Sequence, residues 1–207
     1  MNPLRWAKDK VLHLAWRRGR YTPPDRRLFE VEILPALARE KGNDRILFVG
    51  VDWYTKGCAA AFEGKHFTTL DVAPEQSAFG GFAHVVGDLR ELERHFKASE
   101  PFDVVLMNGV IGYGLDHRDD VDRALRACAA RMRAGATLVI GINEEIPTHV
   151  DPMSVPSHRL FEPRSFHRWP SGRVMVPVPF RERTHTYLFW RRRTLPRETM
   201  SRCLSWP

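Results

Sequence analysis

The sequence predicts an α/β fold in which helices cover both faces of a mostly parallel sheet. Strand-like and helix-like segments alternate through the middle of the chain, as they do in folds built from crossover connections. The first expected strand, residues 45–51, is a nearly uninterrupted apolar run, which is typical of a strand covered on both faces. The 207 residues, 43% of them hydrophobic, suffice for one sheet with flanking helices. We therefore expect one compact domain.

The first half of this domain is expected to open with a helix. A proline pair precedes residues 25–41 and Gly42 follows them, which gives this helix a start and a stop signal. After the first strand, a second helix is expected at residues 55–63, where three alanines allow close approach to the sheet. Further strands are expected at residues 67–72, 83–86 and 102–108.

The clearest helix signal in the chain comes next. Apolar side chains recur at spacings of four, three and four residues and form one helix face, namely Val121, Leu125, Cys128 and Met132. We expect Asp119 or Asp120 to cap the start of this helix and Gly135 to follow its end. A fifth strand is expected directly afterwards, at residues 137–142.

The remaining segments have weaker signals. Residues 143–172 contain repeated prolines and no sustained periodicity, which indicates a loop-rich lid or a short broken helix. Residues 173–178 and 184–190 have the composition of strands, and the five residues between them permit a hairpin.

Two strand ends indicate a nucleoside site. Gly50 ends the first apolar run, and Asp71 ends the second, 21 residues later. In α/β sheets, a glycine turn brings the backbone close to the ligand, and a carboxylate at the tip of the next strand accepts hydrogen bonds from the ribose hydroxyls. A carboxylate at a strand end can also cap the following turn, so both interpretations of Asp71 stay open.

Four stretches in this order resemble the class I S-adenosylmethionine-dependent methyltransferases. They are residues 46–54, 69–74, 86–89 and 102–111. The resemblance covers residues 28–193 and implies a three-layer, Rossmann-like sheet of seven strands, mostly parallel with an antiparallel C-terminal strand. It also implies S-adenosyl-L-methionine as the cofactor.

The same resemblance implies cofactor contacts at the ends of the first four strands. Asp71 would bind the ribose, Asp88 and the next backbone N–H the adenine, and the end of the fourth strand the methionine part. The full set is Gly50, Asp52, Trp53, Tyr54, Asp71, Val72, Asp88, Leu89, Asn108, Gly109 and Val110. A helix cap at Asp88 and a tight turn at Asn108 and Gly109 are the alternatives.

The first motif departs from the family pattern. The family has an acidic residue at the place of Phe48 and glycines at the places of Asp52 and Tyr54, and only glycine leaves such a space free of a Cβ atom. One interpretation is that Asp52 accepts hydrogen bonds from the cofactor's ammonium group while Trp53 or Tyr54 packs on cofactor or substrate. The other is that these residues cap the next helix and fill a pocket that a degenerate enzyme has lost.

Candidate catalytic residues follow the fourth and fifth strands, whose carboxyl ends border the ligand crevice of an open sheet. They are Tyr113, Asp116 and His117, with Asn143, Glu144 and His149 after the fifth strand. His117 beside Asp116 is a candidate oriented base, or a surface residue that precedes the next helix. We expect no metal ion, because Asp116, His117, Glu144, His149 and Asp151 match no compact ligand motif.

Other polar side chains carry weaker hypotheses. In residues 143–172, Arg159, Arg164 and Arg168 are candidates for binding an anionic substrate, or are solvated. The histidines His158, His167 and His185 have no pairing in the sequence that indicates more than a surface or core role.

The net charge of +7 is concentrated at the chain ends. Residues 1–27 hold eight Lys/Arg and two Asp/Glu, and residues 181–207 hold seven and two, so the segment between them is net negative. We expect a basic N-terminal helical extension at 1–27, the methyltransferase-like domain at 28–193 and a basic tail at 194–207. The extension is amphipathic from Trp6 onward, which favours contact with an anionic membrane, a partner protein or its own domain.

Cellular location and redox state follow from composition. No apolar stretch reaches the length that spans a bilayer, and the N-terminus lacks the apolar core of a secretory signal, so we expect a cytoplasmic protein. The cysteines Cys58, Cys128 and Cys203 form no paired motif, which favours buried thiols over disulfides or a zinc site.

Three classes of function remain open at this point. The leading hypothesis is an enzyme that methylates a small-molecule acceptor, such as a metabolite or glycan precursor, because the middle of the chain is not basic. The alternatives are a non-catalytic binding or partner protein that keeps the fold with a degenerate cofactor site, and an RNA methyltransferase that uses its basic termini. We do not expect a nucleic-acid partner, since phosphate binding places positive charge around the cleft.

Overall fold

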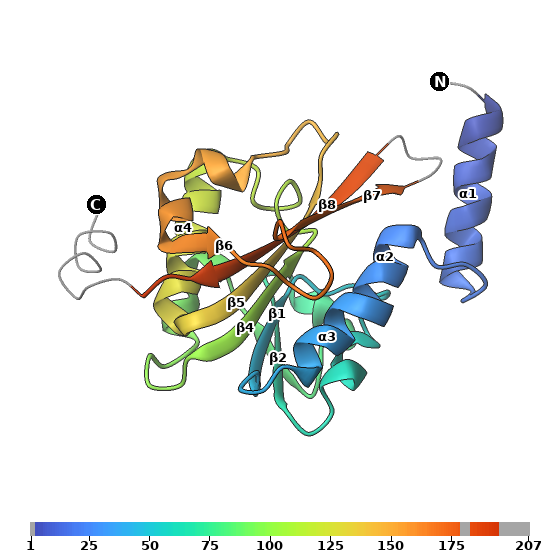
Figure 1. Cartoon of the computed structure of the whole chain (residues 1–207). Helices are drawn as coiled ribbons and strands as arrows, with labels where there is room; N and C mark the ends of the chain where they lie inside the picture. Colours follow the sequence, from blue (N-terminus) through green and yellow to red (C-terminus); the bar gives the residue numbers. More distant parts are fainter. Residues whose placement is uncertain (1–2, 179–182, 195–207) are drawn as a thin grey trace.

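The computed structural model describes residues 3–178 and 183–194 and contains an eight-stranded sheet flanked by helices (Figure 1). The strand order is β3-β2-β1-β4-β5-β8-β6, and β7 also pairs with β8. The strands are β1 (Arg45–Val49), β2 (His66–Asp71), β3 (Ala83–Val86), β4 (Phe102–Asn108), β5 (Met132–Asn143), β6 (Phe161–Pro163), β7 (Arg173–Val178) and β8 (Arg183–Arg192). The first five pair in parallel, and β8 is antiparallel to β5. The expected mixed α/β fold is confirmed.

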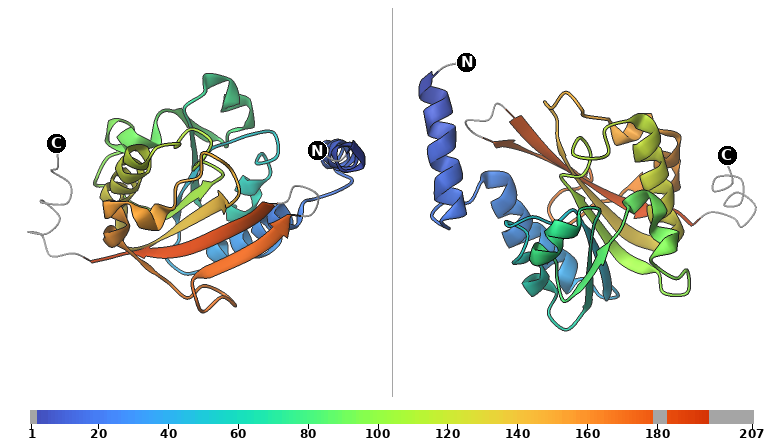
Figure 2. Two further views of the ribbon diagram at one scale, coloured as in Figure 1. Left: turned by 90° about the horizontal axis from the view of Figure 1, so that it is seen from above. Right: turned by 180° about the vertical axis from the view of Figure 1, so that it is seen from behind.

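Side chains of the central strands alternate between two apolar cores. From β1, Leu47 and Val49 pack in one core with Leu125 of α4 (Arg118–Arg131). Ile46 and Phe48 pack in the other core, with the helices that precede β1. Figure 2 shows α4 on one side of the sheet and the N-terminal helices on the other. Burial on both faces explains why the sequence of β1 lacks polar alternation.

The helix expected at 25–41 forms as three consecutive pieces. These are α2 (Pro24–Leu28), the π-helical turn η1 (Phe29–Ile33) and α3 (Leu34–Arg39). The helix expected at 55–63 is only the 3-10 helix η2 (Cys58–Phe62). Two further 3-10 helices, η3 (Pro74–Phe79) and η4 (Leu89–Arg94), follow β2 and β3. The helical segments of these three crossovers are therefore short 3-10 turns, and the one after β1 is shorter than the helix that the sequence predicts.

Three expectations around α4 are wrong. The residue preceding the helix is His117, and it makes no side-chain capping bond. Asp119 and Asp120 lie inside the first turn, where carboxylates interact favourably with the helix dipole. Met132 is the first residue of β5 rather than the last of the helix, and Gly135, with a φ of +79°, lies within that strand.

The C-terminal part forms the expected hairpin, with β7 antiparallel to β8. The residues that join them, 179–182, lie outside the described part of the chain. Residues 143–172 form two short 3-10 turns, η5 (Pro152–Ser154) and η6 (Pro156–Leu160), and then β6. β6 pairs with the end of β8, which makes the sheet one strand larger than the seven expected.

The N-terminal helix α1 (Pro3–Arg17) lies at the periphery of the molecule (Figure 1). The helical segment that covers the sheet begins at Pro24, inside the extension expected at 1–27. Of the tail expected at 194–207, residues 195–207 lie outside the described residues, as does Cys203. Within residues 3–178 and 183–194, no helix is long and apolar enough to cross a membrane.

Candidate functional site

The carboxyl ends of β1, β2 and β4 meet where the strand order reverses between β1 and β4. Ligands of open α/β sheets bind at such a point. Gly50, just after β1, has a φ of +80°, and its amide donates to the carbonyl of Leu70 on β2 at 2.9 Å. A Cβ atom at Gly50 would lie 3.1 Å from the Val110 side chain after β4. Glycine at this position therefore permits both the turn and the close approach of the two strand ends.

Asp71 joins the tips of β1 and β2. Its Oδ2 accepts a hydrogen bond from the Val51 amide at 2.9 Å, and its Oδ1 accepts one from the Ala73 amide at 2.9 Å. The side chain remains partly exposed, and each carboxylate oxygen has a second lone pair. Asp71 is thus a turn cap, as the alternative interpretation expected, and it keeps two acceptor positions for a ligand such as a diol. The adjacent Val72 is 67% exposed.

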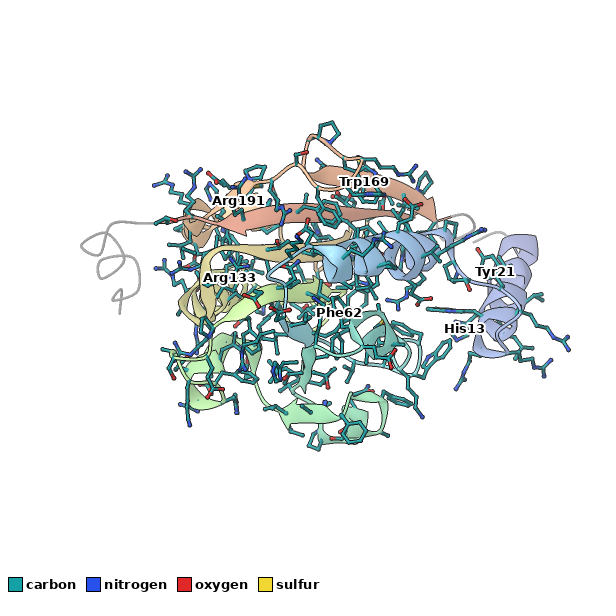
Figure 3. The ribbon with its side chains drawn as sticks, turned by 60° about the horizontal axis from the view of Figure 1, so that its bottom comes forward. His13, Tyr21, Phe62, Arg133, Trp169 and Arg191 are labelled. Atoms are coloured by element: carbon teal, nitrogen blue, oxygen red, sulfur yellow. The ribbon has the colours of Figure 1, made fainter. Side chains whose placement is uncertain are left out.

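Tyr54, which stands at a glycine position of the family pattern, belongs to an aromatic cluster with Trp53 and Trp16. Asp52 starts a turn in which its Oδ1 accepts from the Trp53 amide at 2.7 Å. The rings of Trp53 and Tyr54 lie 4.8 and 5.0 Å from that of Trp16 on α1. His13 of the same helix lies 6.2 Å from Trp53, between α1 and the rest of the domain (Figure 3). Helix α1 therefore packs against the bulky side chains that follow β1.

Tyr54 is also held from the domain side. The Arg26 guanidinium lies 5.0 Å from its ring centre, and burial, followed by the nearby Asp52, raises the pKa of Tyr54. The ring borders a surface pocket of about 430 Å³, lined by Glu30, Leu34, Pro35, Tyr54, Gly57, Cys58, Ala60 and Ala61. This pocket lies between α3 and η2, and Asp71 does not line it.

Asp88 has strong partners within the chain. It precedes η4, and its Oδ1 accepts from the Arg90 amide at 2.8 Å, as in the helix-cap alternative. The Arg90 guanidinium also binds both carboxylate oxygens and reaches Asp120 at 2.5 Å. The hydrogen bond from Arg90 lowers the pKa of Asp88. Leu89 is buried in the core, and adenine binding at this pair stays a prediction.

The loop after β4 is pinned to the end of β5. The Gly109 amide donates to the carbonyl of Gly141 at 3.0 Å. Thr148 Oγ1 donates to the carbonyl of Gly112 at 2.8 Å. Gly112 has a φ of +84°, which L side chains rarely adopt. The glycines thus allow a turn that holds the following residue, Tyr113, at the mouth of the sheet.

The three predicted catalytic residues follow this turn and differ in their contacts. Tyr113 is 51% exposed, and its hydroxyl lies 3.1 Å from Asn143 Nδ2 and 3.3 Å from Arg183 Nη1. Asp116 Oδ1 accepts from the Gly114 amide at 3.1 Å. His117 is exposed at the start of α4. The structure therefore brings Tyr113 together with residues of β5 and β8, whereas Asp116 and His117 lie on the surface.

His185 on β8 has the core role that the sequence left open, and it also has polar partners that the sequence did not indicate. Its Nδ1 lies 3.0 Å from Asn143 Oδ1 and its Nε2 lies 3.1 Å from Asn108 Oδ1. Burial, and then the charge of Arg26, lowers the pKa of His185 from 6.5 to about 4. His185, Tyr187 and Phe189 alternate along β8 and are all buried. This alternation was the available signal, because a histidine on the buried face of a strand must find polar partners.

The other candidate residues are engaged elsewhere. Arg164 pairs with Glu40 at 2.7 Å and Arg168 with Glu32 at 2.9 Å. Glu144 pairs with Arg173 at 2.9 Å. Figure 3 shows Trp169, from the same segment as these arginines, against β8, where it stacks on Phe189 at 5.4 Å. Binding of an anionic substrate by the arginines stays a prediction, and two of them already neutralise glutamates of the N-terminal helices.

Metal ligands and thiols are the remaining candidate groups. Within residues 3–178 and 183–194, no group of three His, Cys, Asp or Glu side chains is placed to hold a metal ion. Cys58 and Cys128 are buried free thiols, and burial raises the pKa of Cys128 to about 12.

Solved structures provide the comparison that decides the fold family. N-methyltransferase NodS from Bradyrhizobium japonicum WM9 matches with a TM-score of 0.59 and 14% identity, over 83% of this chain and 98% of that chain. A TehB-like SAM-dependent methyltransferase from Corynebacterium glutamicum matches with a TM-score of 0.57 and 18% identity, over 93% and 100%. The chain has the class I methyltransferase fold.

A third match is 1,6-didemethyltoxoflavin-N1-methyltransferase from Burkholderia thailandensis, with bound 1,6-didemethyltoxoflavin and S-adenosylhomocysteine. Its TM-score is 0.55 at 19% identity, over 94% of this chain and 92% of that chain. No protein-family model matches the sequence, and no curated protein matches it significantly. At such low identity the class I methyltransferase fold is shown by shape, and the chemistry has to be argued from the residues.

Proposed function

We propose that this protein transfers a methyl group from S-adenosyl-L-methionine to a small-molecule acceptor. The observation that carries the proposal is the site at the tips of β1 and β2 in a class I methyltransferase fold. Gly50 turns the chain without a Cβ atom, and Asp71 is held rigidly by two backbone amides while keeping two acceptor positions. A preorganised carboxylate of this kind suits the two hydroxyls of a ribose.

The residues present fit the cofactor. Asp71 would hold the ribose, and the backbone at Gly50 and Gly109 would approach the methionine part. The ring of Tyr54, which stands at a glycine position of the family pattern, contacts Trp16 and Arg26, so this added bulk has partners within the protein. The bound cofactor would supply a methyl group on a sulfonium, which is open to in-line displacement.

The protein's own contribution is to position the acceptor. Displacement at a methyl carbon requires the nucleophile in line and near contact, so orientation supplies most of the catalysis. Tyr113, Asn143 and Arg183 lie at the carboxyl ends of β4 and β5 and at the start of β8. They form the polar wall against which an acceptor would be oriented. A small acceptor is favoured because the basic residues are concentrated outside the middle of the chain.

A non-catalytic binding protein is the second candidate. The altered first motif favours it, because Phe48, Asp52 and Tyr54 stand where the family pattern has an acidic residue and two glycines. The two functions differ in a simple measurement, calorimetric binding of S-adenosylmethionine and S-adenosylhomocysteine to the full chain. Absence of binding at millimolar cofactor would exclude the enzyme.

The site assignment has a sharper test. Asp71→Ala should lower the affinity for S-adenosylhomocysteine at least about tenfold, because hydrogen bonds to a charged group contribute about 1.5–3 kcal/mol. Asp71→Asn keeps one carbonyl oxygen for the backbone and serves as the matched control, with an intermediate loss. Unchanged affinity in a folded Asp71→Ala protein would contradict the ribose assignment.

A further inference from the structure

One edge of the sheet is open and apolar. β3 is the last strand at its end of the sheet and, among the strands of the described residues, pairs with β2 alone. Residues 76–87, which contain β3, include no Lys, Arg, Asp or Glu, although 28% of the chain is charged. Phe82, just before the strand, is fully exposed, and Val86 at its end is 45% exposed. This edge therefore presents backbone groups and apolar side chains to solvent without a charge between them.

The other edges among the described strands have features that oppose pairing. β6 lies at the opposite end of the sheet, is three residues long and contains Glu162 and Pro163. β7, which pairs with β8, contains Arg173 and Pro177. Charged side chains, proline and short length are the means by which natural edge strands avoid association. β3 contains neither a charged residue nor a proline, so it is the edge suited to association.

The backbone groups of alternate residues in β3 point away from β2. The Gly87 amide donates to the carbonyl of Asp71 at 2.8 Å. At the other end of the strand, the Gly81 amide donates to a threonine side chain of β2 at 3.0 Å. The odd-numbered residues thus face β2. Because hydrogen-bonding groups alternate between the two sides of a strand, the N–H and C=O groups of His84 and Val86 face outward.

This outward spacing is self-complementary under a two-fold axis. With the axis at His84 and a second copy running antiparallel, the two His84 residues exchange both of their backbone hydrogen bonds. The same register places residue 82 of each copy opposite residue 86 of the other. Side chains that face each other in this way lie about 5 Å apart at their Cβ atoms, so Phe82 covers Val86 on both sides of the axis. The two exposed apolar residues of the edge are thereby buried together.

We propose that β3 is a homodimer interface, at which two copies of this chain join their sheets edge to edge in an antiparallel register centred on His84. The two-fold axis runs perpendicular to the sheet, and the two sheets become one. The parallel strands of the two copies then run in opposite directions, so the two candidate sites open at opposite edges of the joined sheet. Asp71 is the ladder partner of Val86, so the interface borders the candidate cofactor site. The proposal does not depend on methyl transfer.

The interface is small, and the dimer should be weak. One pair of short strands with Phe82 and Val86 buries less than the about 1,200–2,000 Å² of a standard stable interface. We therefore expect a dissociation constant of roughly 1–100 µM, which is the range of weak and transient contacts.

Sedimentation equilibrium of the full-length protein measures this association directly. Between about 1 and about 300 µM, the average mass should rise from that of the monomer toward twice that value. Salt should have little effect, because the paired edges carry no charged side chains. A protein that stays monomeric over this range overturns the proposal and leaves the edge to a different partner. Growth into a series of larger oligomers also overturns it, because a two-fold contact closes at two copies.

A charge swap tests the register. Phe82→Glu and Val86→Lys each put a charge opposite an apolar side chain and should weaken dimerisation at least about tenfold. In the double variant a carboxylate faces an ammonium group on both sides of the axis, because residue 82 opposes residue 86 twice. Its affinity should return to within about threefold of the natural protein. Both residues are exposed in the single chain, so the urea midpoints of dilute samples should stay unchanged.

Met175→Glu is the matched control. Met175 is 54% exposed on β7, an edge that already contains a charge and a proline, so this variant should dimerise like the natural protein. A dimer that survives Phe82→Glu lies at a different surface and overturns the proposal. A double variant that is as weak as the single ones overturns the register, and with it the pairing centred on His84.

Discussion

Acidification from about pH 7.5 to about pH 5 should destabilise this fold through one buried side chain, His185. Its pKa is lowered from 6.5 to about 4, first by burial and then by the charge of Arg26, and Glu144 opposes this shift. A lowered pKa means that the unfolded chain binds the proton more tightly than the folded one. The contribution of neutral His185 to the free energy of unfolding is therefore complete above about pH 6.5. It is lost as the pH falls toward about 4.

The size of the effect follows from the two pKa values. The difference between 6.5 and about 4 corresponds to about 3 kcal/mol in the free energy of unfolding, at about 1.4 kcal/mol per pKa unit. Roughly 2 kcal/mol of this should be lost by about pH 5. Carboxylates with a lowered pKa, such as Asp88 beside Arg90, lose their contribution only at lower pH and fall outside this interval.

The assay is urea unfolding of the full-length protein at several pH values. In His185→Gln the absolute stability should fall, but the loss of stability between about pH 7.5 and about pH 5 should shrink by roughly 2 kcal/mol. His117→Asn, which replaces an exposed histidine, is the matched control for the removal of one imidazole. If His185→Gln shows the same pH dependence as the natural protein, His185 is not held neutral in the fold.

Three further expectations concern stability. In urea titrations, Gly141→Ala should lower the free energy of unfolding by about 1–3 kcal/mol, because the added methyl group overpacks the core. Gly57→Ala, where a Cβ meets nothing within 4 Å, should change it by less than about 0.5 kcal/mol. Asp103→Ala removes the acceptor of two backbone amides, at 2.8 and 2.9 Å, and should cost about 2–4 kcal/mol. Glu100→Ala at an exposed pair should cost under about 1 kcal/mol. Deletion of residues 1–20 should lower the helical circular dichroism only by the contribution of α1 and lower the melting temperature by only about 3–6 °C, since it removes one set of aromatic contacts; unfolding of the remaining domain would contradict a peripheral helix.

The helical segments of this chain are of two kinds. The helix with a regular apolar stripe, around Val121 and Leu125, forms where the periodicity predicts it. The segment after β1 contains good helix formers but becomes turns and a short 3-10 helix, because the loop is organised by Trp53 and Tyr54 packing against Trp16 of a distant helix. Local propensity was outweighed there by contacts that no local pattern encodes.

The residues of the predicted site also fall into two groups, those with a local signature in the sequence and those without one. Gly50 and Asp71 were visible because backbone geometry and strand ends leave local signatures, and their contacts bring the tips of β1 and β2 together. The alternation along β8 indicated that His185 is buried but not its partners, since Asn108 and Asn143 are 77 and 42 residues away in the chain. Its character as a neutral, oriented imidazole depends on burial and on the neighbours of both ring nitrogens.

The sequence by itself determined the order of strands and helices, the strand that is buried on both faces, and the glycine and carboxylate at the first two strand ends, because each of these depends on neighbouring residues in the chain. Only the tertiary structure decided that β6 adds a strand beside β8, and that Asn108, Asn143, Tyr113 and His185 meet at one end of the sheet. The hydrogen-bond partners and the charge of a buried imidazole are set by groups that only folding brings into contact.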